Sequence, residues 1–163
     1  ATKRQTRHHG LARDRGLELR FIEYMPLDAE HHWQASDVLD GDAIRRTLET
    51  EFGPLLPVDR PHSSQPATDF VYADGGGRIG LIRPVSQPFC GDCDRVRLTS
   101  DGQLRNCLFA QGETDLRAPM RTGATDDEVV ALMQSCLAAK RAGHGIDDPT
   151  FLQPPRPMSA IGG

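Results

Sequence analysis

Three cysteines lie close together in the sequence with the spacing C-x₂-C-x₁₃-C: Cys90, Cys93 and Cys107. Two thiolates separated by two residues can bind one metal centre from a single turn of chain, and a third can reach the same centre after a hairpin. Three thiolates leave one position of a four-coordinate site unfilled. In a structural zinc site a distant residue fills that position, whereas a cluster that does chemistry keeps it open for a substrate.

Other residues could complete a zinc site. Four of the six histidines are candidates, although none has finger-like spacing to the cysteines: His31, His32, His62 and His144. The fourth cysteine, Cys136, lies where apolar residues recur at helical spacing, so core packing is its expected role. A zinc-stabilised interaction module without catalysis therefore stays open beside a catalytic cluster. Disulfides are not expected, because the N-terminus shows no secretory segment.

Two arginines, Arg95 and Arg97, directly follow the cysteine pair and alternate along a predicted strand. A pair of guanidinium groups at this spacing suits the bidentate binding of phosphate oxygens. Most charged strand residues simply face water, which would be the ordinary interpretation of an Arg-x-Arg sequence. The neighbouring cysteines favour the phosphate-binding interpretation here.

The turn at Asp101-Gly102 decides which side chains accompany the third cysteine. A two-residue turn would place Cys107 opposite Val96, with the arginines on the other face. A three-residue turn with Gly102 in the left-handed bulge position would place Cys107 opposite Arg95, on the face of Arg97. The local sequence leaves both registers open.

The remaining sequence predicts mixed α and β elements. Residues 1–10 show no usable periodicity and are expected to fray, whereas 11–16 end a helix at Gly16 and 17–25 form a mostly buried strand. Apolar residues at i, i+4 and i+8 predict an amphipathic helix at 42–52. Short extended runs at 69–73, 78–85, 95–99 and 103–109 predict an antiparallel sheet, followed by a helix at 126–141 and an extended tail.

The bulk composition excludes several classes of partner. A formal net charge of −4 gives no electrostatic footprint for nucleic acid or for an anionic membrane. No apolar run approaches the ~20 residues that span a bilayer, so a cytoplasmic protein is expected. A hydrophobic content of 37% is modest for a self-sufficient core.

Several stretches together resemble one enzyme family. They are residues 89–99 (FCGDCDRVRLT) with Asp101-Gly102 and Cys107-Leu108, residues 21–26 (FIEYMP), and residues 156–163 (RPMSAIGG). From about Gly16 to Gly163 the chain resembles the C-terminal region of the GTP 3′,8-cyclase family, radical S-adenosylmethionine (SAM) enzymes also called molybdenum cofactor biosynthesis protein A. The family converts GTP to (8S)-3′,8-cyclo-7,8-dihydroguanosine 5′-triphosphate in molybdenum cofactor (molybdopterin) biosynthesis.

The resemblance implies a fold and a domain division. The family folds as an incomplete (βα)₆ barrel whose C-terminal part covers the open side. Residues 1–26 would be the last helix–strand unit of that barrel. Residues 27–163 would be a small α+β domain with an antiparallel sheet and an extended Gly-Gly tail.

The resemblance also implies the roles of individual residues. An auxiliary [4Fe–4S] cluster held by three cysteines keeps one iron open for the guanine of GTP, and two arginines bind GTP. A methionine at the strand end contacts SAM, and the Gly-Gly tail reaches into the active site. Carried over by motif, the cluster ligands are Cys90, Cys93 and Cys107, the GTP ligands Arg95 and Arg97, the SAM contact Met25, and the catalytic tail Gly162 and Gly163.

One motif of the family is missing. No C-x₃-C-x₂-C sequence, which binds the SAM-cleaving cluster, occurs in the 163 residues. The resemblance therefore implies the substrate-binding part without the radical generator, whether as a truncated, split or excerpted cyclase, and little activity of the chain alone. Expected partners are GTP and the missing radical SAM barrel half or a full-length homologue, and a homodimer is expected as a further form of association. SAM would bind only together with the missing part.

Overall fold

The computed structural model describes residues 2–28 and 30–161, and these fall into two compact units. The first unit comprises Ala1–Met25 and Gln34–Phe89, and the second comprises Pro26–Trp33 and Cys90–Gly163. The fold is mixed α/β with antiparallel pairing in both of its sheets. The incomplete barrel and the division at residue 26 stay predictions.

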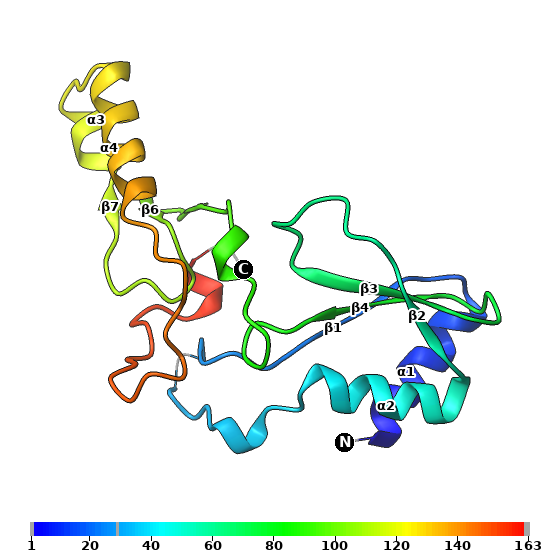
Figure 1. Cartoon of the computed structure of the whole chain (residues 1–163). Coiled ribbons are helices and arrows are strands. Elements are labelled where there is room, and N and C mark those ends of the chain that lie inside the picture. The colour runs from blue at the N-terminus through cyan, green and yellow to red at the C-terminus, as the bar shows by residue number, and fades with distance from the viewer. Residues whose placement is uncertain (1, 29, 162–163) are drawn as a thin grey trace. The chain divides into compact units, whose positions relative to one another are not determined.

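The first unit is built on a four-stranded sheet of order β1-β4-β3-β2 (Figure 1). β1 runs parallel to β4, whereas β4 with β3 and β3 with β2 are antiparallel. The elements are α1 (Thr2–Asp14), β1 (Leu19–Ile22), the 3₁₀ turn Ala35–Asp37, α2 (Gly41–Phe52), β2 (Leu55–Pro57), β3 (Ala67–Tyr72) and β4 (Arg78–Ile82).

Helix α2 forms where its apolar spacing predicts it and supplies one side of the core. Asp40 caps it by accepting a hydrogen bond from the amide of Ala43 at 2.7 Å, and Gly53 ends it at φ 96°. Ile44 and Leu48 are buried with strand residues of the sheet, including Leu55, Phe70, Ile79 and Leu81.

A buried carboxylate joins three segments of this unit. Glu23, only 2% exposed, follows β1 and accepts hydrogen bonds from the amides of Gly41 at 2.9 Å, Val85 at 3.0 Å and Ser86 at 2.8 Å. The first amide opens α2 and the other two follow β4. A buried carboxylate is unfavourable unless it accepts hydrogen bonds, so these bonds hold the end of β1 next to the start of α2 and the segment after β4.

Two sequence expectations for this unit are wrong in part. Residues 1–10 were expected to lack regular structure, yet α1 begins at Thr2. The helix packs through His9, whose ring lies 4.8 Å from that of Phe52 and 5.1 Å from that of Tyr72, so a polar residue occupies the core position. β1 was expected to be mostly buried, but its residues alternate between half-buried and exposed, so one of its two faces is open to solvent.

The second unit contains a three-stranded antiparallel sheet of order β5-β6-β7. Helices and strands of this unit are β5 (Arg97–Leu98), β6 (Gln103–Arg105), β7 (Thr114–Asp115), α3 (Arg117–Arg121) and α4 (Asp126–Ala138), with 3₁₀ turns at Cys90–Asp92 and Met158–Ala160. The strands are shorter than the sequence predicts, and β7 and α3 were not predicted.

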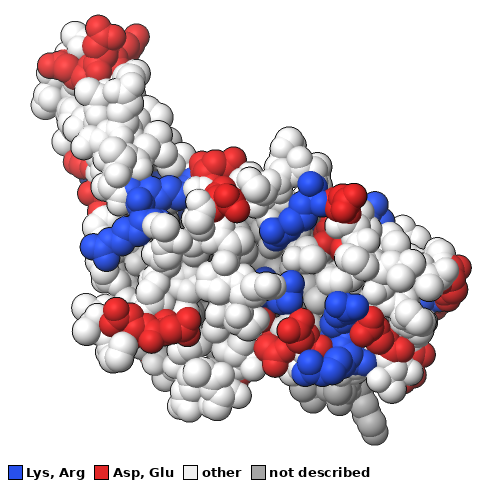
Figure 2. Space-filling model, viewed as in Figure 1, with Lys and Arg blue, Asp and Glu red and all other residues white. Residues whose placement is uncertain are grey.

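Helix α4 begins at a capping box, because Thr125 and Glu128 each bond the other's backbone amide. Figure 2 shows acidic side chains gathered at the tip of the α3–α4 segment, where the first turn of α4 contains Asp126, Asp127 and Glu128. Negative charge there complements the helix dipole. Cys136 is buried with Leu104 and Leu116, which confirms its expected role in the core. Within the described residues, no helix is both long and apolar enough to cross a membrane.

His9 makes the stability of the chain depend on pH. Burial lowers its pKa, and the nearby positive charge of Arg13 lowers it further from the ordinary 6.5. The folded chain thus binds fewer protons than the unfolded chain, so the free energy of unfolding should fall as the pH drops below about 6.5. Urea denaturation at pH 7.5 and pH 5.5 should show a smaller pH dependence in His9→Leu than in the wild type.

The neighbouring His8 provides a matched control, because it is exposed on the same helix. His8→Leu should keep the pH dependence of the wild type. Equal pH dependence in all three proteins would show that His9 is not a source of it.

Candidate metal and phosphate site

The β5–β6 hairpin has the three-residue turn. Thr99 donates its amide to the carbonyl of Gln103 at 2.9 Å, and Gly102 donates to the carbonyl of Thr99 at 3.0 Å. Gly102 has φ 82°, and a Cβ there would lie 2.7 Å from the Cβ of Arg117. Both the left-handed backbone and the close neighbour therefore require glycine. Of the two registers that the sequence left open, this is the one that aligns the arginines with the third cysteine.

The register determines which side chains share a face. Arg97 pairs with Arg105 across the strands, and Arg95 and Cys107 each lie two residues beyond that pair, where the ladder has ended. Arg95 and Arg97 are half-buried, whereas Val96 is 40% exposed and Leu98 is 62% exposed. If the arginines simply faced water, they would be more exposed than Val96 and Leu98. The arginines therefore occupy the less exposed face of this strand.

Arg95 bonds directly to one of the three cysteine sulfurs. Its Nε and Nη2 donate to the Sγ of Cys93 at 3.3 and 3.2 Å. Partial burial raises the pKa of the Cys93 thiol, but the backbone amide and the guanidinium of Arg95 outweigh it, and the net shift is downward. This favours the thiolate, which is the form that binds metals.

Cys90 has the opposite environment. Burial raises the pKa of its thiol, and the negative charge of Cys107 raises it further, while the backbone amide of His144 acts against both. The sulfurs thus lie within electrostatic reach of one another. Arg97 belongs to the same neighbourhood, because burial and then the charge of Arg95 lower its pKa while Cys107 and Cys93 raise it.

All four cysteines are free thiols. Among the residues that the structure describes, no group of three or more His, Cys, Asp or Glu side chains is arranged to hold a metal ion. The chemistry of the donor set fits a three-thiolate cluster, because three half-buried thiols lie beside cationic side chains. Their role as ligands stays a prediction.

The structure does not test the other predicted site residues. Met25 follows β1 in the first unit and is half-buried. Gly162 and Gly163 lie outside the described residues. Their roles therefore stay predictions as well.

The tail before Gly162 is held by contacts that the sequence did not predict. Arg156 bonds both carboxylate oxygens of Asp101, at 3.1 and 2.8 Å, and lies 2.9 Å from a carboxylate oxygen of Glu113. Glu113 also pairs with the buried Arg105 at 2.5 Å, and Ile161 is fully buried. No local pattern indicates this network, because it joins residues far apart in the sequence.

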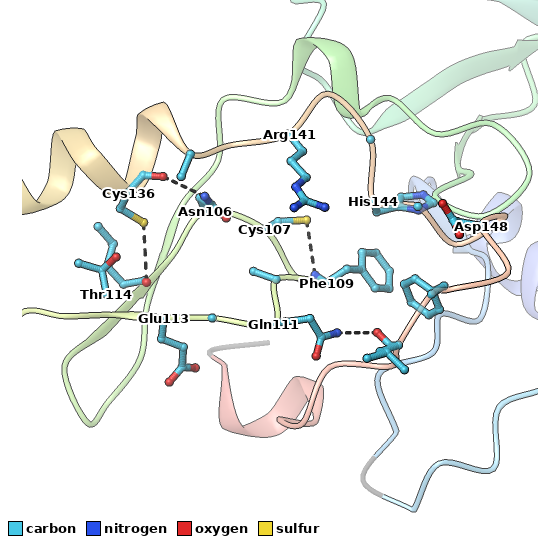
Figure 3. Close-up of a pocket in the computed structure, with 18 of the residues that line it drawn as sticks. Asn106, Cys107, Phe109, Gln111, Glu113, Thr114, Cys136, Arg141, His144 and Asp148 are labelled. Atoms are coloured by element: carbon cyan, nitrogen blue, oxygen red, sulfur yellow. Dashed lines mark hydrogen bonds between the residues drawn. The ribbon is translucent and has the colours of Figure 1, made fainter.

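A cavity of about 580 Å³ lies beside the third cysteine in the second unit. Cys107 and Cys136 line it, and Figure 3 shows Arg141 and His144 reaching it from the loop after α4. The ring of His144 lies 5.0 Å from that of Phe109. The cavity therefore combines aromatic and cationic side chains next to a predicted ligand.

Comparison with known proteins identifies the family of the chain. Residues 17–146 match the family described as Molybdenum Cofactor Synthesis C. The chain belongs to this family. The resemblance drawn from the sequence is thereby confirmed.

Curated relatives of this family member carry the name GTP 3′,8-cyclase. One from Rhodopirellula baltica is 50% identical over 152 residues, and one from Mycolicibacterium smegmatis is 52% identical over 152 residues. One from Streptomyces coelicolor is 49% identical over 146 residues. These alignments cover 90–92% of this chain but only 42–43% of each relative, so the chain spans about two fifths of their length.

The burial of Cys136 predicts that it is not a metal ligand. Its thiol donates to the carbonyl of Leu104 at 3.8 Å inside the small core. Cys136→Ser should leave the metal content of the reconstituted chain unchanged and lower the free energy of unfolding by about 1 kcal/mol. Metal analysis and urea denaturation measure the two effects, with Cys107→Ser as the variant that should lose metal. Loss of metal from Cys136→Ser would instead favour the zinc-stabilised module.

Proposed function

We propose that this chain carries the auxiliary [4Fe–4S] cluster and the GTP-binding residues of a GTP 3′,8-cyclase. In molybdenum cofactor biosynthesis such an enzyme converts GTP to (8S)-3′,8-cyclo-7,8-dihydroguanosine 5′-triphosphate. Cys90, Cys93 and Cys107 are the proposed cluster ligands, and Arg95 and Arg97 are the proposed GTP ligands. The names of the relatives support this proposal.

The observation that carries the proposal is the exposure pattern of residues 95–98, in which the charged side chains are less exposed than the apolar ones. The two arginines take the protected face toward the thiols, and two apolar side chains take the exposed one. Partly burying two neighbouring cations is unfavourable unless anions compensate them. Thiolates supply part of that compensation, and a triphosphate placed beside them would supply more.

The proposed ligands would have different roles in catalysis. When bound, the cluster would supply an iron with an open coordination position for the purine. Arg97 and Arg95 would neutralise the triphosphate and fix the nucleotide, which keeps the ribose in one orientation. Met25 would contact SAM, and Gly162 and Gly163 would complete the active site from the tail.

The radical itself would come from outside this sequence, since the motif of the SAM-cleaving cluster is missing. The proposed source of the radical is therefore a radical SAM barrel half or a full-length homologue, and a homodimer is proposed in addition. The proposed compartment is the cytoplasm.

The cluster can be tested by anaerobic reconstitution with iron and sulfide. The chain should bind about four irons, with the brown absorbance of a [4Fe–4S] cluster. Each of Cys90→Ser, Cys93→Ser and Cys107→Ser should lower the iron content, because three thiolates hold the cluster. Tight binding of tetrahedral zinc without brown absorbance would contradict the proposal.

Arg97 allows a separate test of GTP binding, because no hydrogen bond joins it to a cysteine sulfur among the described residues. Arg97→Ala should weaken GTP binding to the reconstituted chain by about 1.5–3 kcal/mol, the value of a charge-assisted contact, and leave iron content unchanged. Isothermal titration and iron analysis measure the two quantities. Arg121→Ala, an exposed substitution at the end of α3, is the control. GTP affinity equal to that control would show that Arg97 binds no phosphate.

A further inference from the structure

The ammonium group of Lys140 bridges two backbone carbonyls of the second unit. Its Nζ donates to the carbonyl of Arg95 at 2.7 Å and to the carbonyl of Asn106 at 2.5 Å. Arg95 follows Cys93 by two residues, and Asn106 directly precedes Cys107. One side chain therefore joins the segment of the cysteine pair to the segment of the third cysteine.

The bridge lies where the strand pairing has ended. The ladder between β5 and β6 reaches Arg97 and Arg105 and goes no further. Beyond that pair, the two segments no longer exchange the regular backbone hydrogen bonds of a sheet. The ammonium of Lys140 joins the two segments there instead, because its N–H donors can rotate to reach two carbonyls at once.

Lys140 follows the C-terminal end of α4, and contacts of that helix fix its position. The side-chain amide of Asn106 donates to the carbonyl of Cys136 at 2.9 Å, and the thiol of Cys136 donates to the carbonyl of Leu104. The amide of Lys140 donates to the carbonyl of Leu137 at 3.0 Å, continuing the last turn of the helix. The end of α4 is thus docked on the segment before Cys107, and the ammonium extends from it to Arg95.

The choice of lysine fits this geometry. Lys3 and Lys140 are the two lysines among the 19 lysine and arginine residues of the chain. A guanidinium has its donors fixed in a planar fork suited to carboxylates, whereas a compact ammonium can point its protons at separate carbonyls. The positive charge of Lys140 also reaches the Cys93 thiolate.

We propose that Lys140 is a positioning residue for the three-thiolate site. It holds the two cysteine-bearing segments at a fixed separation and adds a positive charge near the sulfurs. This inference rests on the proposed cluster. Its two parts, the tether and the charge, can be measured separately.

The tether is tested in the metal-free chain by hydrogen–deuterium exchange. Lys140→Met should speed exchange at least fivefold in peptides covering residues 93–97 and 104–108. Arg121→Met removes one positive charge from an exposed position of α3 and should leave these peptides unchanged. Exchange in Lys140→Met equal to that of Arg121→Met would overturn the tether, whether or not the chain binds iron.

The charge is tested after anaerobic reconstitution. Loss of iron to a chelator should be at least fivefold faster in Lys140→Met than in Arg121→Met. The cluster midpoint potential should also become more negative, because removal of a nearby cation disfavours the added electron. Lys140→Arg keeps the charge and should keep the potential, although its planar fork should restore the exchange protection only in part. Unchanged chelation rate and potential in Lys140→Met would overturn the role at the cluster.

The proposed function and the proposed role of Lys140 can be contradicted independently. A wild-type chain that takes up no iron would overturn the proposed function. The exchange experiment would still decide whether Lys140 joins the two segments. Circular dichroism of each variant reports whether α4 is retained, and loss of α4 in Lys140→Met alone would make the lysine a folding residue and overturn the proposal.

Discussion

The left-handed conformation of Gly102 sets the register of the β5–β6 hairpin, and the arrangement of the candidate site depends on that register. With one residue fewer in the turn, every side chain of one strand would face the opposite side relative to its partner. Arg95 and Arg97 would then lie away from the third cysteine. The observed turn instead gives Arg97 and Arg105 as a cross-strand pair and leaves Val96 and Leu98 exposed. The requirement is strict, because the Cβ of Arg117 approaches the position that a side chain at Gly102 would need.

Several cations of the second unit bond backbone and carboxylate oxygens. Its buried apolar cluster is small, consisting of Leu104, Leu116 and Cys136 with the partly buried Leu132. Buried Arg105 pairs with Glu113 and also donates to the carbonyls of Leu108 and Ala110. Such buried pairs contribute specificity more than net stability, since the desolvation of each charge offsets much of its attraction. Arg105 thereby bonds the backbone of the loop after Cys107 at two points.

The sequence predicts the parts whose signal is local. The apolar spacing predicted α2 within one residue, and α4 begins at Asp126 as predicted, although it ends at Ala138 and not at residue 141. The same reasoning failed at α1, because the residue that anchors it is the buried His9 and not an aliphatic side chain. It also failed at the tail, where Arg156 and Ile161 are held by partners far along the chain. Periodicity carries no information about such contacts.

The candidate site shows the same division between local and distant determinants. Cysteine spacing and the Arg-x-Arg sequence identified the residues, but only the three-dimensional register selected one of two faces for them. The charge balance around the sulfurs needed the structure as well. Arg95 lowers the pKa of the Cys93 thiol, whereas burial and the negative charge of Cys107 raise that of Cys90. The cationic side chains therefore outweigh burial at Cys93 but not at Cys90, so the two thiols of the C-x₂-C pair differ in how readily they become thiolates.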